Sequence, residues 1–244
     1  MTSSTAPTGI TIRGLTKTYG SVTGLTNLGL DLPTGGIVGL MGDNGAGKTT
    51  LLKILAGVLA DWTGDVRLFG HPVSPQTKAF TSFLPDAECL PGRYKVVDAL
   101  GLYADFFADF DRARADALIA GFELPLDRRL RAFSKGMREK LQIALTMARR
   151  AKVFLLDEPI SGVDPASRSV IMESILKNYD SEALLVMSTH LIADIEPVVD
   201  RVIFLRAGQV LLEGEADDLR DTHHMSIDHL FREVYRNVRQ TVQA

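Results

Sequence analysis

Hydrophobic positions along the chain follow different periods, and the changes of period divide the sequence into regions. From Ile10 to Leu32 apolar and polar residues alternate loosely, which predicts strands joined by a turn around Tyr19-Gly20-Ser21. The uninterrupted apolar run Ile37–Met41 predicts a strand that is buried on both faces. Shorter runs follow after a polar break, and we expect further strands at Asp65–Gly70 and Ala79–Leu84.

Between about Ala87 and Ala148 the period changes to that of a helix, which indicates a helical insert. The spacing predicts a first helix with one face formed by Val97, Leu100, Gly101, Ala104 and Phe107. It predicts a second helix, capped by Asp111, that carries Ala115, Leu118 and Ile119. It predicts a third helix over Gly136–Arg150 that turns inward Leu141, Ala144, Leu145 and Ala148.

The last part of the chain returns to short buried runs. Val153–Leu156 and Ala183–Met187 predict strands of a parallel sheet, with a helix between them over Ala166–Asn178. A hairpin through Ala207-Gly208 is expected next. These patterns together predict an α/β fold with an antiparallel β portion and an inserted helical subdomain at about 87–150.

A final helix is predicted over residues 226–238. Its apolar stripe consists of Ile227, Leu230, Phe231, Val234, Tyr235 and Val238. Docking on the domain is the favoured interpretation, and a partner-binding helix is the alternative. We therefore divide the chain into an N-terminal tail (1–8), one domain (9–222) and a docked C-terminal helix (223–244).

Composition narrows the classes of function. The chain has 244 residues, a net charge of −3 and a single cysteine, Cys89, so no internal disulfide is expected. No apolar run approaches the roughly 20 residues that span a bilayer, and Met1–Thr8 lacks the features of a secretory signal. The negative net charge argues against general nucleic-acid binding. Basic residues gather between Arg128 and Lys152, either as a solvated helical face or as a surface for phosphates or anionic lipid.

The clearest chemical signal is a loop that fits the pattern G-x-x-x-x-G-K-[ST], Gly42-Asp43-Asn44-Gly45-Ala46-Gly47-Lys48-Thr49-Thr50. It lies between the predicted strand Ile37–Met41 and a helical run, Leu51–Leu55, as a phosphate-binding loop requires. Its glycines let backbone N–H groups point into one concavity that holds a polyphosphate. Lys48 supplies charge for the β- and γ-phosphates, Thr49 a hydroxyl for Mg²⁺, and the helix N-terminus faces the anion.

Polar residues also follow two other predicted strands. Asp157 and Glu158 end the run Val153–Leu156, and because neighbouring side chains diverge at a strand end, they can take different roles. Asp157 suits Mg²⁺, usually through its water, and Glu158 suits a general base that polarises water. His190 follows the strand at Ala183–Met187 and can reach a γ-phosphate there, although a lone histidine is usually structural.

A second phosphate-binding feature begins the third predicted helix. Ser134 can cap this helix, and Gly136 exposes backbone N–H groups at its positive end. Because these residues lie on the helical insert, they need not serve the nucleotide of the same chain.

In this order the motifs resemble those of the ATP-binding cassette (ABC) ATPases, over roughly Ile10 to Gly214. The matching segments are Gly42–Thr50 for the Walker A loop, Val153–Glu158 for Walker B with its catalytic glutamate, Phe133–Met137 for the Leu-Ser-Gly-Gly-Gln signature, Ser161–Asp164 for the D-loop and His190 for the switch histidine. Tyr19 stands where the family stacks an aromatic residue on adenine, although it can equally be an ordinary turn tyrosine.

Three positions depart from the family pattern. Lys135 and Met137 replace the first glycine and the glutamine of the signature, and Asp86 replaces the glutamine of the Q-loop. Asp86 still offers oxygen to Mg²⁺. In these departures the chain resembles the branch of the family that serves ABC-2 type exporters, in which acidic Q-loops and Ser-Lys-Gly-Met signatures occur.

The resemblance implies a RecA-like P-loop core that binds ATP with Mg²⁺ and hydrolyses ATP. It implies head-to-tail dimers in which each ATP lies between one Walker A loop and the Ser134 and Gly136 of a second copy or of a paralogue. It also implies a separate transmembrane permease subunit that docks at Ala87–Lys95, a role in export, and a peripheral location on the cytoplasmic side of the cell membrane. No nucleic-acid partner is expected.

Two other classes of function stay open at this point, a soluble ABC ATPase and a P-loop kinase or GTPase. A soluble ABC ATPase acting on ribosomes or DNA usually has two cassettes in one chain or a long insertion, and neither is present in this sequence. A GTPase would require an Asn-Lys-x-Asp motif for guanine, which the sequence lacks. A P-loop kinase would leave the signature-like segment without a role.

Overall fold

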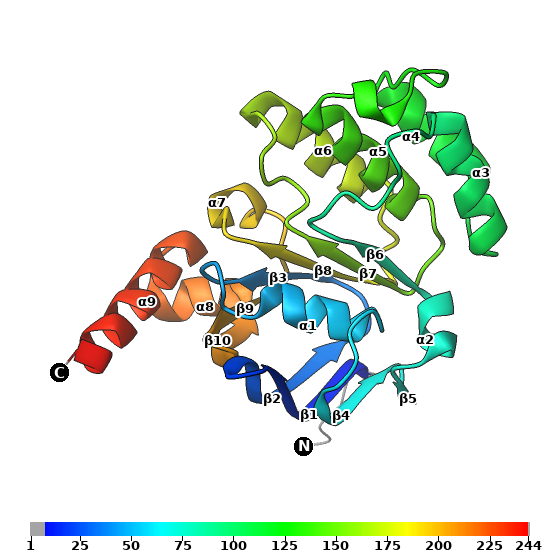
Figure 1. Cartoon of the computed structure of the whole chain (residues 1–244). Coiled ribbons are helices and arrows are strands. Elements are labelled where there is room, and N and C mark those ends of the chain that lie inside the picture. Colours follow the sequence, from blue (N-terminus) through cyan, green and yellow to red (C-terminus); the bar gives the residue numbers. More distant parts are fainter. Residues whose placement is uncertain (1–7, 244) are drawn as a thin grey trace.

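The computed structural model describes the backbone of residues 8–243 and the side chains of residues 8–237. The predicted N-terminal tail lies outside the described residues except for Thr8, which begins the first strand. Within the described part, strands form two sheets, and helices lie between and beside them (Figure 1). The α/β fold with an antiparallel portion and a helical insert is thus confirmed.

The smaller sheet is antiparallel and has the strand order β2-β1-β4-β5. Its strands are β1 (Thr8–Tyr19), β2 (Val22–Pro33), β4 (Thr63–Leu68) and β5 (His71–Pro72). Burial alternates along β1 and β2, as the sequence pattern predicts, and Leu30 pairs with Ile12 across the two strands. The buried face therefore covers a core, and the turn between β1 and β2 places Tyr19 at its tip.

The larger sheet has the order β10-β9-β3-β8-β7-β6, and all neighbours are parallel except β10 and β9. Its strands are β3 (Ile37–Met41), β6 (Thr81–Leu84), β7 (Val153–Asp157), β8 (Leu184–Thr189), β9 (Arg201–Arg206) and β10 (Gln209–Glu215). Every residue of β3, β7 and β8 is buried, which explains their uninterrupted apolar runs. Because these strands run parallel, their carboxyl ends meet at one edge of the sheet.

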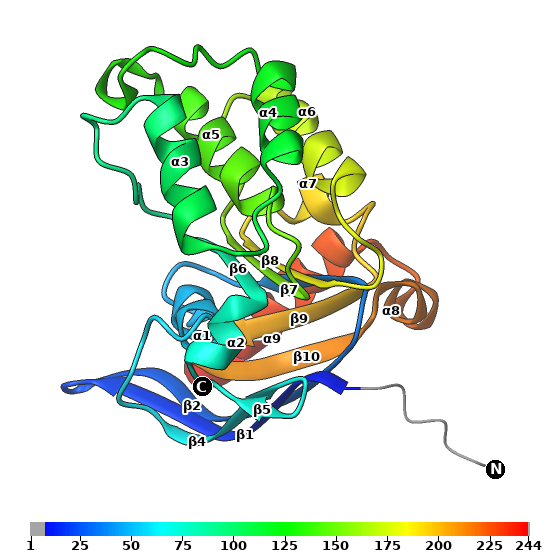
Figure 2. The same cartoon turned by 90° about the vertical axis from the view of Figure 1, so that its right-hand side faces the viewer.

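The two faces of the larger sheet pack against different elements. Val153 and Leu155 of β7 join a core shared with the smaller sheet and with helix α1 (Lys48–Leu55), whereas Phe154 and Leu156 join a core shared with the other helices. Figure 1 shows α1 between the two sheets, and Figure 2 shows the helical insert on the opposite face of the larger sheet. The helices on that side are α3 (Val96–Phe106), α4 (Arg112–Gly121), η1 (Leu130–Ala132), α5 (Lys135–Met147) and α6 (Pro165–Lys177).

The remaining helices are short, apart from the last. They are α2 (Pro75–Ala79), α7 (Ile192–Ile195), α8 (Ala216–His223) and α9 (Ile227–Gln243). Ile227, Leu230 and Tyr235 of α9 are buried in the same core as the helical insert, and Phe231 and Val234 pack against it. Val238, the last residue of the predicted stripe, lies outside the described side chains.

Two details of the sequence prediction are wrong. Helix α3 buries Val96, Ala99 and Leu100, whereas Val97 is 39% exposed and Ala104 is exposed. Both sets have helical spacing and share Leu100, so the periodicity alone could not fix which face packs inward. The predicted third helix ends at Met147 and not at Arg150.

The early end of α5 is explained by Arg149, whose side chain is only 4% exposed. Its guanidinium donates to both carboxylate oxygens of Asp109, at 2.9 and 3.0 Å, and to the carbonyl of Ala79 at 2.8 Å. It also stacks 4.1 Å from the ring centroid of Phe107. If the helix continued through Arg149, the guanidinium would lose these contacts, which connect the helical insert to the residues just before β6.

We predict that Arg149→Met lowers the free energy of unfolding by about 3 kcal/mol or more, because it leaves the Asp109 carboxylate and several carbonyls without their donor. Denaturant unfolding followed by circular dichroism measures the effect. Arg150→Met is the matched control: Arg150 pairs with Asp111, but its side chain is 75% exposed, so stability should stay near that of the native chain. Equal losses of unfolding free energy in the two variants would contradict the structural role assigned to Arg149.

Candidate nucleotide-binding site

The loop between β3 and α1 has a backbone shape that requires its glycines. Gly45 and Gly47 have φ angles of 81° and 107°, in the region that side chains disfavour. A Cβ atom on Gly47 would lie 2.7 Å from the carbonyl oxygen of Gly24, and one on Gly42 would collide with the carbonyl oxygen of Leu205. The loop is therefore pressed between β2 and the end of β9, with its other side open.

Lys48 folds back over this loop and is 5% exposed. Its ammonium donates to the carbonyl of Gly42 at 2.7 Å and lies 3.4 Å from Oε1 of Glu158. The positive charge thus stands at the mouth of the glycine-rich loop, where the sequence places a phosphate-binding lysine.

The carboxylate of Asp157, at the end of β7, is almost completely buried at 1% exposure. Its Oδ1 accepts hydrogen bonds from Thr49 at 3.1 Å and from Ser188 at 2.6 Å. Its Oδ2 is buried, and among the described residues it has no hydrogen-bond partner. An orphaned carboxylate oxygen beside a hydroxyl suits a hard cation, so Thr49 and Asp157 fit a Mg²⁺ ion.

Glu158 follows directly and stands between two basic side chains. Its Oε2 lies 2.9 Å from Nδ1 of His190, and its Oε1 faces Lys48. Its φ of 52° is unusual for a residue with a side chain, and its N–H is held by the hydroxyl of Ser188 at 3.1 Å. The backbone twist turns Glu158 away from Asp157, so the two carboxylates can take separate roles.

An open hollow runs from Lys48, Thr49 and Glu158 to the tip of the smaller sheet. It is lined by Tyr19, Val22, Thr23, Gly24, Asp43, Asn44, Gly45, Ala46, Gly47, Lys48, Thr49, Thr50, Asp86 and Glu158. Tyr19 is 46% exposed, and its hydroxyl lies 3.4 Å from Oγ1 of Thr50, so its ring stands at one end of the loop. Asp86 lines this hollow and also a second one with Asp157 and Glu158, but it is exposed. Contact between Asp86 and a metal ion stays a prediction.

The other predicted nucleotide contacts lie apart from this hollow. Ser134 caps α5 by accepting a hydrogen bond from the N–H of Met137 at 3.2 Å, as predicted, but neither Ser134 nor Gly136 is among the lining residues. The side chain of Lys135 lies over Gly162, where a Cβ atom would collide with its ammonium group. Burial raises the pKa of the neighbouring Glu139, and Lys135 partly offsets this effect.

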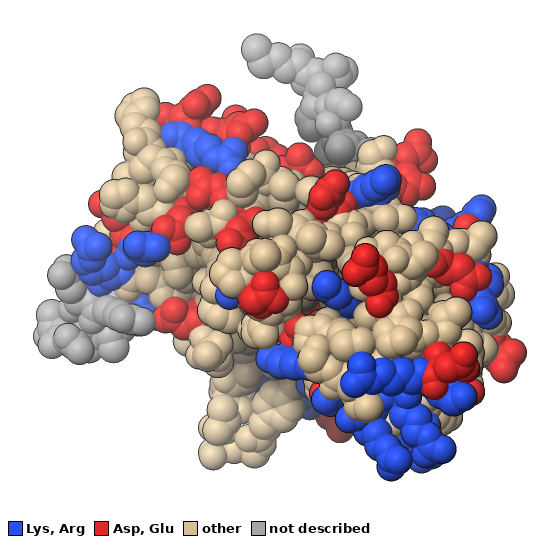
Figure 3. Space-filling view, turned by 90° about the horizontal axis from the view of Figure 1, so that it is seen from above, with Lys and Arg blue, Asp and Glu red and all other residues tan. Residues whose placement is uncertain are grey.

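The basic segment at 128–152 does not form one continuous positive surface. Arg138 pairs with Glu88, Arg149 with Asp109 and Arg150 with Asp111. In Figure 3, Lys and Arg side chains gather at one side of the face, and acidic side chains are interspersed over the rest. The positive charges of these three arginines are offset by carboxylates, so they do not support the interpretation of this segment as an extended phosphate-binding surface.

Sequence reasoning missed several residues of the site. Val22, Thr23 and Gly24 line the hollow from β2, where no motif marked them. Ser188 bonds both Asp157 and the backbone of Glu158, and its signal was the change from apolar to polar residues at the end of β8.

We predict that Lys48→Ala weakens ATP binding at least about tenfold, because a charge-assisted contact to phosphate contributes roughly 1.5–3 kcal/mol. Isothermal titration calorimetry with Mg·ATP measures the effect. Lys53→Ala, which changes another lysine on α1 outside the hollow, serves as the control. An affinity unchanged from that of the native chain would contradict the assignment of the loop.

Comparisons with known proteins place the chain in one family. A family model described as "ABC transporter" matches residues 25–161. The daunorubicin resistance ATP-binding protein DrrA3 of Streptomyces coeruleorubidus is 33% identical, over 93% of this chain and 75% of that protein. The lantibiotic transport ATP-binding protein SrtF of Streptococcus pyogenes is 30% identical, over 84% of this chain and 90% of that protein.

Solved structures show the same fold. The ATP-binding subunit of an ABC transporter superposes with a TM-score of 0.83 at 26% identity, covering 93% of this chain and 99% of that one. A nucleotide-free ATP-binding cassette gives a TM-score of 0.76 at 17% identity, covering 93% and 98%, which bears on the fold alone. The chain therefore belongs to the ABC transporter family, as an ATP-binding subunit that uses Mg²⁺ and hydrolyses ATP.

Proposed function

We propose that this subunit drives export through a separate membrane-spanning partner, and that it does so as a dimer that closes on ATP. The observation that carries the proposal is the separation of the two phosphate-binding features within one chain. The hollow at the Walker A loop is open, whereas Ser134 and Gly136, at the N-terminus of α5, are not among the residues that line it. A second copy or a paralogue that presents its own α5 would complete each site.

Support for export comes from the names of similar proteins. Similar proteins are named for daunorubicin resistance, Nod factor export and lantibiotic transport. Within the described residues, no helix has both the length and the apolar character needed to cross a bilayer. A soluble ABC ATPase is the alternative function, and copurification with a multi-spanning membrane protein distinguishes the two.

The residues of the site divide the work of hydrolysis. Lys48 and the N–H groups of the loop hold the phosphates. On binding, a phosphate takes the place of Glu158 as the partner of the Lys48 ammonium group. Glu158 accepts a proton from water, and His190, bonded to its Oε2, holds the carboxylate in place. Thr49 and Asp157 would hold a Mg²⁺ ion, and its positive charge would offset that of the phosphates. Tyr19 stacks on the base.

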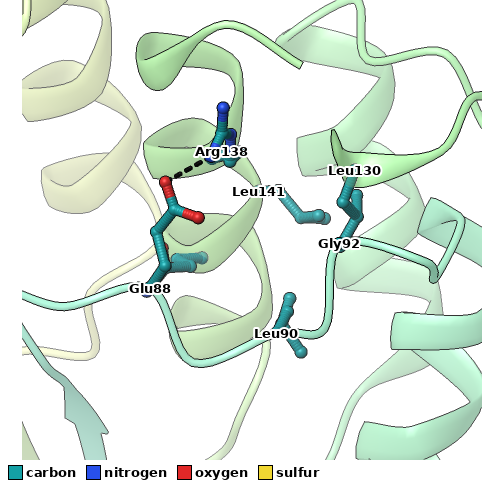
Figure 4. A pocket seen from close by; sticks show the side chains of 7 residues that line it. Glu88, Leu90, Gly92, Leu130, Arg138 and Leu141 are labelled. Atoms are coloured by element: carbon teal, nitrogen blue, oxygen red, sulfur yellow. Dashed lines mark hydrogen bonds and ion pairs between the residues drawn. The ribbon is translucent and has the colours of Figure 1, made fainter. Parts of the chain in front are cut away.

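A hollow beside the helical insert offers a surface for the membrane partner. Figure 4 shows Leu90, Leu130 and Leu141 around it, with the ion pair between Glu88 and Arg138 at its edge, 2.5 Å long. One wall belongs to the segment Ala87–Lys95, which the family resemblance implies as the docking surface. Docking of a membrane partner here would hold the subunit at the cytoplasmic side of the membrane.

The docking segment is also tied to the nucleotide site. Gln142 of α5 donates to the carbonyl of Ala87 at 3.2 Å, immediately after Asp86 at the edge of the nucleotide hollow. A partner that moves Ala87–Lys95 would therefore shift Asp86 as well, which gives the proposal a physical route between hydrolysis and transport.

We predict that Glu158→Gln traps an ATP-bound dimer, because the amide keeps the shape of the carboxylate but cannot accept the proton of water. Size-exclusion chromatography with light scattering, in Mg·ATP, should show twice the monomer mass. The double variant Lys48→Ala, Glu158→Gln should stay monomeric and so controls for non-specific association. Fast ATP turnover in the single variant would remove Glu158 from the role of base.

A further inference from the structure

The C-terminal helix α9 reaches the base of the phosphate loop. The hydroxyl of Tyr235 donates to the carbonyl of Leu205, at the end of β9. That same carbonyl oxygen is the atom nearest to the missing Cβ of Gly42, and the Tyr235 hydroxyl would lie 3.2 Å from such a Cβ. Tyr235 therefore stands directly under the first residue of the loop.

Leu205 supports both ends of the loop. Its carbonyl lies under Gly42, and its side chain lies 3.4 Å from the place of a Cβ on Gly47. Two residues past β9, the N–H of Gly208 donates to the carbonyl of Ala46 at 2.9 Å. The glycines have no side chains that could anchor the loop. The position of the loop backbone is therefore set by the end of β9 and by the turn that follows it.

Tyr235 is fixed in this position by its surroundings. It is 4% exposed, its ring lies 4.1 Å from that of Phe231, and Phe231 packs edge-on against Phe204 of β9. The guanidinium of Arg206 lies 5.6 Å from the Tyr235 ring centroid. These contacts hold the hydroxyl against the Leu205 carbonyl and leave the side chain little freedom.

The other end of α9 is anchored to Glu196, the residue that follows helix α7. The N–H groups of Ile227 and Asp228 donate to the carboxylate of Glu196 at 2.8 and 3.2 Å. Glu196 follows α7, the short helix that begins two residues after His190. Figure 1 shows α9 running along this side of the molecule from α7 and α8. The helix thus joins the segment behind His190 to the base of the phosphate loop.

We propose that Tyr235 is a positioning residue for ATP binding. Through its hydrogen bond to Leu205, it holds the backbone of the phosphate loop in the position in which the loop binds phosphates. The inference rests on the assignment of Gly42–Thr50 as the nucleotide loop and goes beyond hydrolysis and transport. Tyr235 lies behind the loop and is not among the residues that line the nucleotide hollow. It acts on binding and leaves the groups that perform the chemistry unchanged.

The test is Tyr235→Phe, which keeps the ring and removes only the hydroxyl. We expect the Kd for Mg·ATP to rise about three- to tenfold, as the loss of one buried hydrogen bond allows, and the KM to rise with it. The kcat at saturating ATP should stay within about twofold, because Glu158 and His190 keep their places. Calorimetric titration and steady-state hydrolysis measure these quantities.

Tyr179→Phe is the matched control. The Tyr179 hydroxyl donates to the carbonyl of Ala183 at 2.6 Å, at the amino end of β8 and so away from the nucleotide edge. Both variants should lower the melting temperature by similar amounts, but only Tyr235→Phe should weaken ATP binding. Native-like affinity in Tyr235→Phe, or an equal loss in Tyr179→Phe, overturns the inference.

The Lys48→Ala variant separates this inference from the function on which it rests. If Lys48→Ala loses ATP binding and Tyr235→Phe does not, the loop assignment stands and only the role of Tyr235 fails. If Lys48→Ala binds ATP as the native chain does, the nucleotide loop itself is misassigned.

Discussion

The buried carboxylate of Asp157 is the group on which the site depends. It stands at the end of β7 and accepts hydrogen bonds from Thr49, which follows β3, and from Ser188, at the end of β8. Helix α1 and the strands β7 and β8 are thus joined at the edge where the carboxyl ends of the parallel strands meet. Its second oxygen lacks a partner among the described residues, which leaves one position for a cation.

Around this carboxylate, the parallel sheet gathers groups that are far apart in the sequence. Lys48, Glu158 and His190 form a continuous chain of contacts of 3.4 and 2.9 Å. The antiparallel sheet adds Tyr19 at the other end of the loop. The helical insert does not complete this arrangement within the chain, since its capped helix presents Ser134 elsewhere. We therefore propose that each chain contributes two complementary half-sites to a dimer.

Features that depend on local sequence were predicted well. The glycine-rich loop, the caps at Asp111 and Ser134 and the buried strand β7 each follow from a few adjacent residues. Pairings between distant segments were not predictable: Ser188 meets Asp157, and Tyr235 meets Leu205, across about thirty residues of chain. The inward face of α3 was also missed, because two sets of residues had the same spacing. The catalytic roles and the dimer stay predictions.

Complementation between two damaged chains tests the split site most directly. One chain carries Lys48→Ala, which damages its phosphate loop, and the other carries Ser134→Arg, which blocks its signature. In a mixed head-to-tail dimer both lesions fall in one composite site and the other stays intact, so coexpressed chains should hydrolyse ATP although neither does alone. If the mixture is as inactive as each variant by itself, each chain holds its own complete site and the account is wrong.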